Sequence, residues 1–78
     1  MNEHELEQFI LNYLANHPDA WISFEDLDKL LANEAPEWSE TIRRSYLRGE
    51  VGRMLRSGQI KRKKTSAEYQ LSDDVNLF

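Results

Sequence analysis

Residues 58–71 of the chain read GQIKRKKTSAEYQL. Ile60 lies near the start of this stretch, Tyr69 and Leu71 lie at its end, and the residues between them are polar or small, with four consecutive bases. Two short runs with apolar residues, separated by a polar segment, predict two antiparallel strands. No Gly, Asn or Asp marks the turn. We therefore expect a β-hairpin with a basic tip.

A long helical segment precedes this hairpin. It begins after Ser39, a candidate N-cap, and runs to about Ser57, and Gly58 then lies where a helix often ends in a left-handed residue. At about 100° per residue the apolar side chains form two stripes, Trp38, Ile42 and Tyr46 on one side and Leu47, Val51, Met54 and Leu55 on another. Either the helix bends or breaks near Gly49, or one stripe faces a second partner. Gly49 and Gly52 also permit the close approach of a helix or a phosphate backbone.

Two further helices are expected upstream. Residues 3–16 carry apolar side chains at helical spacing and end before Pro18. Residues 24–34 follow Ser23, a second candidate N-cap, and end before Pro36. The residues between these helices, 21–23, predict a short extended segment.

The composition is that of one folded domain. The chain has 78 residues, of which 40% are hydrophobic and 31% charged, and we treat 1–78 as a single domain with residues 73–78 as a flexible or interface tail. The absence of cysteine excludes a disulfide framework, a thiolate metal site and a cysteine nucleophile. The apolar runs are too short for a membrane span, and the N-terminal residues lack the features of a signal peptide, so a cytoplasmic protein without a membrane partner is expected.

Charge is distributed unevenly along the chain. The net charge is −4, but residues 1–40 hold ten acids and one base, whereas residues 41–78 hold nine bases and four acids. Such asymmetry concerns the partners of a protein rather than its fold. We expect the basic half to face an anionic partner and the acidic half to be turned away from it.

The order helix, short strand, helix, helix, basic hairpin resembles a winged helix-turn-helix DNA-binding domain. The residues that carry the resemblance are Val51, Met54 and Leu55, the run Gly58-Gln59-Ile60-Lys61-Arg62, and Tyr69-Gln70-Leu71. The resemblance covers about residues 4–72 and is to the superfamily rather than to any one family within it. It implies an α+β fold, a small domain of three helices plus a C-terminal hairpin, the wing. The connection from Asn33 to Ser39 is longer than in the simplest helix-turn-helix proteins.

The resemblance also implies that the third helix docks in the major groove of duplex DNA while the wing contacts the adjacent backbone. The clustered bases fit this independently, because lysine and arginine supply phosphate affinity and arginine can bond guanine. The predicted DNA contacts are Thr41, Arg43, Arg44, Ser45, Arg48, Arg53, Lys61, Arg62, Lys63 and Lys64. We expect a regulator of transcription or an accessory factor that needs no cofactor or metal.

Catalysis has little support in the sequence. His4 and His17 are the only histidines, and no pair of acids is marked as a general acid and base. The alternative function is a protein-interaction module that does not bind nucleic acid. Its partner, or a second copy in a homodimer, would contact the acidic half or the apolar residues Trp38, Val75, Leu77 and Phe78.

Overall fold

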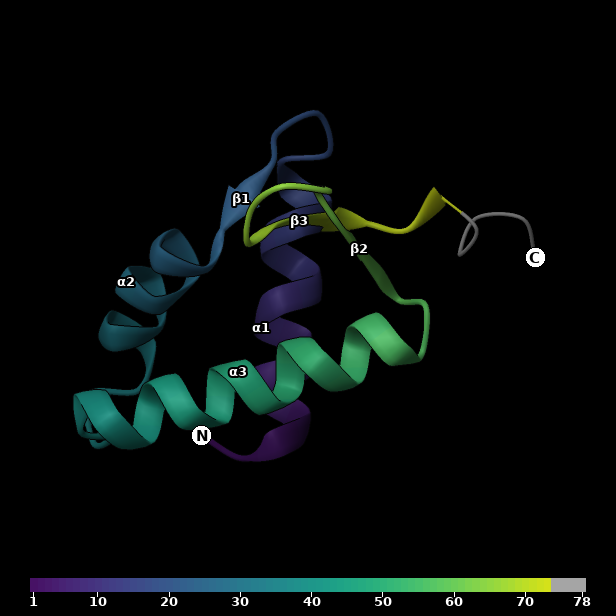
Figure 1. Ribbon diagram of the computed structural model, residues 1–78. Coiled ribbons are helices and arrows are strands. Elements are labelled where there is room, and N and C mark those ends of the chain that lie inside the picture. Colours follow the sequence, from purple (N-terminus) through teal and green to yellow (C-terminus); the bar gives the residue numbers. More distant parts are fainter. Residues whose placement is uncertain (74–78) are drawn as a thin grey trace.

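A computed structural model describes residues 1–73, which contain three helices and three short strands. Their order is α1 (Glu3–Asn16), β1 (Ile22–Ser23), α2 (Phe24–Glu34), α3 (Glu40–Arg56), β2 (Ile60–Arg62) and β3 (Glu68–Leu71) (Figure 1). The α+β class, the three helices and the C-terminal hairpin are therefore confirmed. The predicted tail contacts Val75, Leu77 and Phe78 lie outside the described residues.

The strands form one antiparallel sheet in the order β1-β3-β2. Ile60 pairs with Leu71 across the hairpin, and Ile22 pairs with Tyr69 on the other side of β3. The sequence predicts an extended segment at 21–23 but does not reveal that it joins the hairpin as a third strand. The chain continues this pairing beyond β1, because the Phe24 N–H donates to the Ala67 carbonyl at 2.9 Å. The start of α2 is thus tied to the loop of the hairpin.

Side chains cap the start of each helix. The Asn2 side chain accepts from the Glu5 N–H at 2.9 Å, and the Glu5 carboxylate accepts in return from the Asn2 N–H. Ser23 and Ser39 act as expected, accepting from backbone N–H groups at the starts of α2 and α3. These bonds satisfy donors that a helix start leaves without a partner.

The end of α3 is closed by a glycine in the left-handed region. Gly58 has φ +80°, its N–H donates to the Leu55 carbonyl at 3.2 Å, and the Gln59 N–H donates to the Met54 carbonyl at 3.0 Å. This is the bonding pattern of a Schellman motif, in which glycine avoids the steric cost of a side chain. It turns the chain from α3 directly into β2.

Two glycine substitutions should therefore have opposite effects on stability. Gly58→Ala is expected to lower the free energy of unfolding by about 1 kcal/mol, because alanine resists a positive φ. Gly49→Ala is expected to raise it by about 0.5–1 kcal/mol, because a Cβ there meets no atom within 4 Å and alanine favours helix. Urea unfolding of both variants measures the difference. Equal effects would contradict the assigned cap.

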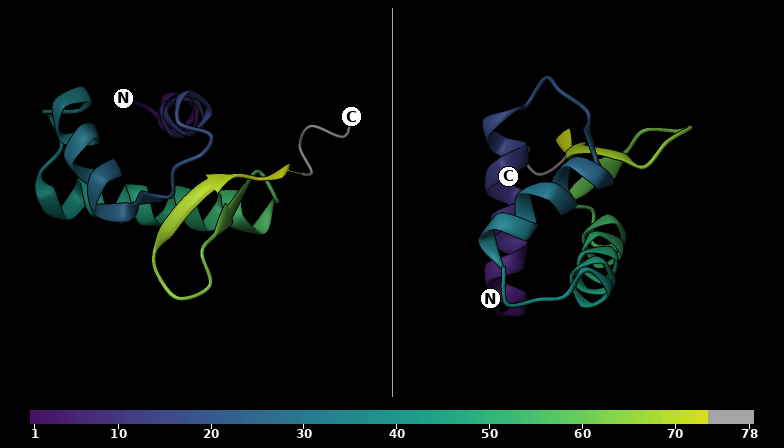
Figure 2. Two further views of the ribbon diagram at one scale, coloured as in Figure 1. Left: turned by 90° about the horizontal axis from the view of Figure 1, so that it is seen from above. Right: turned by 90° about the vertical axis from the view of Figure 1, so that its left-hand side faces the viewer.

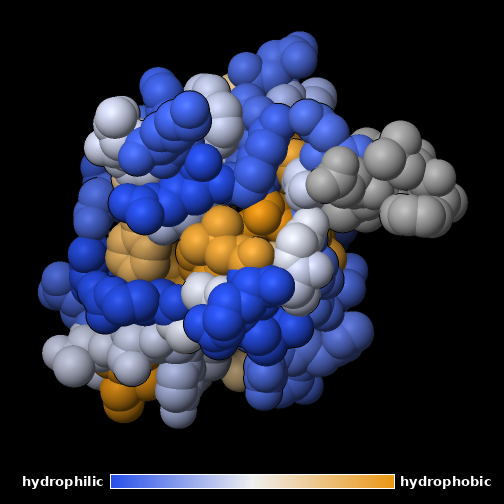
Figure 3. Space-filling view, turned by 45° about the vertical axis from the view of Figure 1, so that its right-hand side comes forward, coloured by the Kyte–Doolittle hydropathy of each residue, from blue (hydrophilic) through white to orange (hydrophobic). Residues whose placement is uncertain are grey.

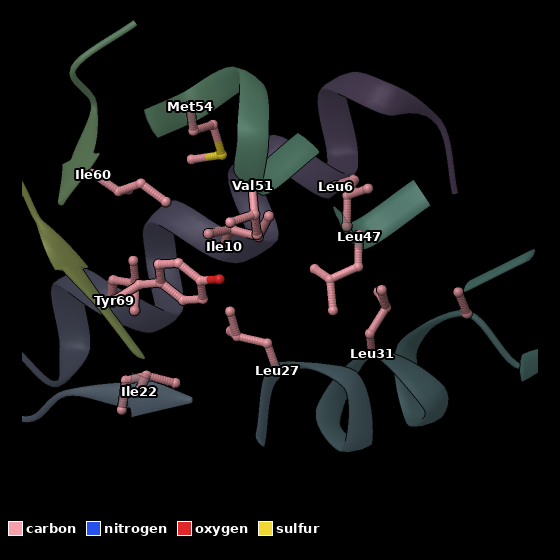
Figure 4. Close-up of a cluster of buried hydrophobic side chains, with 12 residues drawn as sticks. Leu6, Ile10, Ile22, Leu27, Leu31, Leu47, Val51, Met54, Ile60 and Tyr69 are labelled. Carbon is pink, nitrogen blue, oxygen red and sulfur yellow. The ribbon is translucent and has the colours of Figure 1, made fainter. Parts of the chain in front are cut away.

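One hydrophobic cluster joins the helices to the sheet (Figure 4). Its fully buried side chains include Ile10 and Leu14 of α1, Leu27 and Leu31 of α2, and Leu47 and Met54 of α3. Ile22, Ile60 and Tyr69 close it from the sheet. Burying a large apolar side chain in this way stabilises the folded state by roughly 1.5–3 kcal/mol. No helix within residues 1–73 is long and apolar enough to cross a membrane.

The helix α3 is unbroken through Gly49 and Gly52, so the first of the two alternatives, a break near Gly49, is wrong. The stripe that contains Leu47, Val51 and Met54 faces the core. The other stripe lies at the surface, where Ile42 is 45% and Tyr46 is 52% exposed. A helix with one buried stripe and one exposed stripe needs no bend.

Candidate nucleic-acid interface

Two arginines in the first half of α3 are tied to carboxylates of α2. Arg43 donates to both oxygens of Asp28, at 2.7 Å from Nε and 3.2 Å from Nη2. Arg44 donates to Asp28 at 3.0 Å and to the two oxygens of Glu25 at 2.9 and 2.8 Å. The guanidinium of Arg43 holds the pKa of Asp28 below its usual range, and that of Arg44 does the same to Glu25. These contacts fix α2 against α3.

A second cluster joins α1 to the C-terminal half of α3. Arg53 forms ion pairs with Glu50, a buried carboxylate of the same helix, and with Glu7 of α1 at 2.5 Å. The Gln59 side chain donates to the same Glu7 oxygen at 3.3 Å, and these donors lower the pKa of Glu7. Burial of Glu50 is tolerated because its charge is matched. Arg53 is therefore a structural contact of the helix bundle.

Three carboxylates of the acidic half contact α3 directly, whereas the expectation that this half turns away from an anionic partner stays a prediction. Glu7, Glu25 and Asp28 all belong to residues 1–40, and each one contacts an arginine of α3. The reason is electrostatic, because part-buried guanidinium groups are stable only next to a compensating charge. Three of the predicted DNA contacts, Arg43, Arg44 and Arg53, thus already have carboxylate partners.

The other predicted basic contacts are distributed over α3 and the hairpin. Lys61 is engaged, since its Nζ lies 2.9 Å from an Asp73 oxygen and 5.9 Å from the centre of the Trp21 ring. The remaining bases are exposed and pair with no carboxylate among residues 1–73. On α3 and the hairpin they are Arg48, Arg56, Arg62, Lys63 and Lys64. Lys29 of α2 shares this property.

The loop that carries Lys63 and Lys64 projects from the body of the molecule (Figure 2). Arg62 lies at its base and donates to the Ser66 carbonyl at 3.2 Å, which fixes the start of the loop. The Lys63 N–H donates to the Glu68 carbonyl at 2.9 Å, which closes it. These two hydrogen bonds hold the ends of the loop, and Lys63 and Lys64 are exposed to solvent on it.

A groove of about 420 Å³ separates α3 from the hairpin. Phe24, Val51 and Leu55 contribute apolar surface to it, and Arg44, Arg48 and Arg62 are the bases that line it. Figure 3 shows hydrophobic side chains in a hollow with hydrophilic ones on either side. The guanidinium carbons of Arg44 and Arg48 lie 5.1 and 5.5 Å from the centre of the Phe24 ring, within the range of a cation–π contact.

The exposed side of α3 beside this groove is nearly free of acids. Arg48 lines the groove, Thr41, Ser45 and Gly49 are exposed on adjoining turns of α3, and Glu40 in the first turn is the one exposed acid of the helix. Thr41 and Ser45, both predicted contacts, point to solvent with short side chains. This part of α3 can approach an anionic surface closely, because a hydroxyl or a hydrogen replaces a bulky group.

A separate apolar surface lies on the other side of α3. The rings of Trp38 and Tyr46 meet edge to face with their centres 4.9 Å apart, and the exposed Ile42 belongs to the same stripe. A hollow of about 530 Å³, to which Met1 and Gly49 contribute, adjoins Tyr46. The sequence singles out Trp38 in this surface, but Trp38 is half-buried, whereas Ile42 and Tyr46 are exposed.

No site for a metal ion is evident in the described part of the chain, where no three His, Asp or Glu side chains converge. Sequence reasoning also missed Phe24 as a functional candidate, because an apolar residue in the first turn of a helix resembles any core residue.

Comparison of the chain with protein-family models, curated proteins and solved structures gives no match.

Proposed function

We propose that this protein is a winged-helix domain that binds duplex DNA through the exposed side of α3 and the wing, defined as β2, β3 and the loop between them. The observation that carries the proposal is the position of the bases without a carboxylate partner in residues 1–73. All except Lys29 lie on α3 or the wing. The order of elements and the sheet order β1-β3-β2 support the same assignment.

The residues proposed to contact DNA on this surface have two different roles. Lys63, Lys64 and Arg62 project from the wing and suit phosphate contacts, which give affinity without sequence information. Arg48 lines the groove beside the wing and suits a fourth phosphate contact, whereas Thr41 and Ser45 lie on the exposed side of α3, where a side chain in the major groove reaches base edges. Arg43 and Arg53 serve the fold instead. Such a domain acts as a transcription regulator or as an accessory factor on DNA.

The test is a titration of the protein with mixed-sequence duplex DNA at several salt concentrations. Four phosphate contacts predict a slope of log affinity against log salt of about −3.6, so that a fourfold increase in salt weakens binding about a hundredfold. Lys29→Ala is the matched control, because it removes one exposed charge outside the proposed surface, and it should leave the slope unchanged. Absence of binding at low salt would contradict the proposal.

A protein-interaction module is the second candidate, and the exposed Ile42 and Tyr46 beside Trp38 favour it. Large apolar side chains on a surface often mark contacts with other proteins. Tyr46→Ala separates the two functions, since Tyr46 lies on the stripe of α3 away from the groove that holds Arg48. DNA affinity should survive this substitution, whereas binding to a protein partner through the apolar surface should not.

A further inference from the structure

Two carboxylates of different character hold the guanidinium of Arg44. Asp28 is buried, with a side chain 8% exposed, and it also binds Arg43. Glu25 is 63% exposed and lies on the outer side of Arg44, where it accepts two hydrogen bonds. Asp28 therefore anchors the arginine, whereas Glu25 occupies donors that would otherwise face solvent.

These donors open onto the groove between α3 and the wing. Arg44 and Arg48 lie over the same Phe24 ring, and Arg62 lines the groove from the wing. Phe24 is fixed in turn, because it begins α2 and its N–H binds the Ala67 carbonyl of the wing loop. An anion in this groove would meet three guanidinium groups from two elements.

We propose that Glu25 is an internal competitor for a DNA phosphate, and that Arg44 exchanges the Glu25 carboxylate for a phosphodiester when DNA binds. The inference rests on the proposed function. Arginine binds carboxylate and phosphate with the same forked geometry, so one ligand can replace the other. Asp28 keeps its bond to Arg44 throughout and so holds the guanidinium in place. Glu25 thereby makes the domain bind DNA more weakly than its arginines allow.

Glu25→Gln tests this, because it removes the competing charge while keeping the shape of the side chain. One additional phosphate contact should make the salt slope more negative by about 0.9, which raises affinity about eightfold at about 0.1 M salt and leaves it unchanged near 1 M. Arg44→Gln in the Glu25→Gln background should abolish the gain, since it removes the group that the exchange requires.

Asp26→Asn is the matched control. Asp26 is the next residue of the same first turn, is exposed, and forms no ion pair within residues 1–73. It loses the same charge and should raise affinity much less than Glu25→Gln. An equal gain in both variants would show a general charge effect and overturn the proposal.

The outcomes separate this inference from the proposed function. Binding by the unaltered chain with no gain in Glu25→Gln overturns the role of Glu25 and leaves DNA binding intact. Absence of binding in both proteins overturns DNA binding itself, and the competitor role with it. Thermal unfolding of each variant confirms that the compared proteins are folded.

Discussion

Replacing Arg48, Lys63 and Lys64 together with alanine is expected to reduce the affinity for duplex DNA several hundredfold at about 0.1 M salt. The three side chains are exposed and pair with no carboxylate in the described part of the chain. Each lost phosphate contact flattens the salt slope by about 0.9, so the triple variant should lose about 2.7 of it. Titration at several salt concentrations measures both quantities.

Lys29→Ala provides the control for this variant. It also removes an exposed lysine, but Lys29 lies on α2, outside the proposed surface. Its salt slope should match that of the unaltered chain. If each lost charge weakens binding equally in the two variants, the protein attracts DNA by its charge alone and the proposed surface is wrong. Urea unfolding should show little change in either variant.

Removing the carboxylate of Asp28 is expected to lower the free energy of unfolding more than the removal of any exposed charged side chain. Asp28→Ala should lower the free energy of unfolding by about 3 kcal/mol, because it leaves the part-buried guanidinium of Arg43 without its partner. The total free energy of unfolding of a domain of this size is only about 5 kcal/mol, so the midpoint of urea unfolding should shift to a much lower concentration. Asp26→Ala, in the same helix, should change the midpoint little.

A compensating variant distinguishes the loss of a charge pair from damage to packing. Asp28→Leu with Arg43→Met removes both charges and keeps apolar volume, and such replacements of buried pairs are often neutral. It should recover most of the stability lost in Asp28→Ala. The double variant also removes the bond from Arg44 to Asp28, so failure to recover would show that this bond or the packing around it, rather than the pair with Arg43, accounts for the loss.

Acid sensitivity gives an independent readout of the same pair. The Arg43 guanidinium lowers the pKa of Asp28 in the folded protein, so the unfolded chain binds its proton first as the pH falls. The stabilisation is complete above the unfolded value of about 4 and is lost as the pH drops through the folded value. Asp28→Asn should therefore show a shallower loss of stability below about pH 4 than the unaltered chain.

The elements of the fold could be predicted because their signals are local. Ser23, Ser39 and Gly58 mark helix ends through bonds to residues at most four positions away. Strand β1 gives no such signal, because two residues are too few for a periodic pattern and its partner lies more than 40 positions along the chain. The sequence thus predicted the hairpin but not the three-stranded sheet.

The sequence predicts which basic residues belong to the candidate site, but it does not predict which of them are already paired with carboxylates. Arg53 and Glu7 are 46 positions apart, and Arg43 and Asp28 are 15 apart, so only the packing of helices brings them together. Counting charges along the chain therefore treated Arg43 and Arg53 as equivalent to Lys63 and Lys64. That these last two contact DNA stays a prediction.

The central position of β3 has a consequence for the synthesis of the chain. Both β1 and β2 pair with β3 and not with each other, although they are made first. Neither strand has a partner until the ribosome has released residues 68–71. Tyr69 also fills the core from this strand, so the buried cluster stays incomplete until then. An mRNA truncated shortly before the codons for residues 68–71 would yield a chain whose helices have no sheet to pack against. Cellular proteases would degrade that chain.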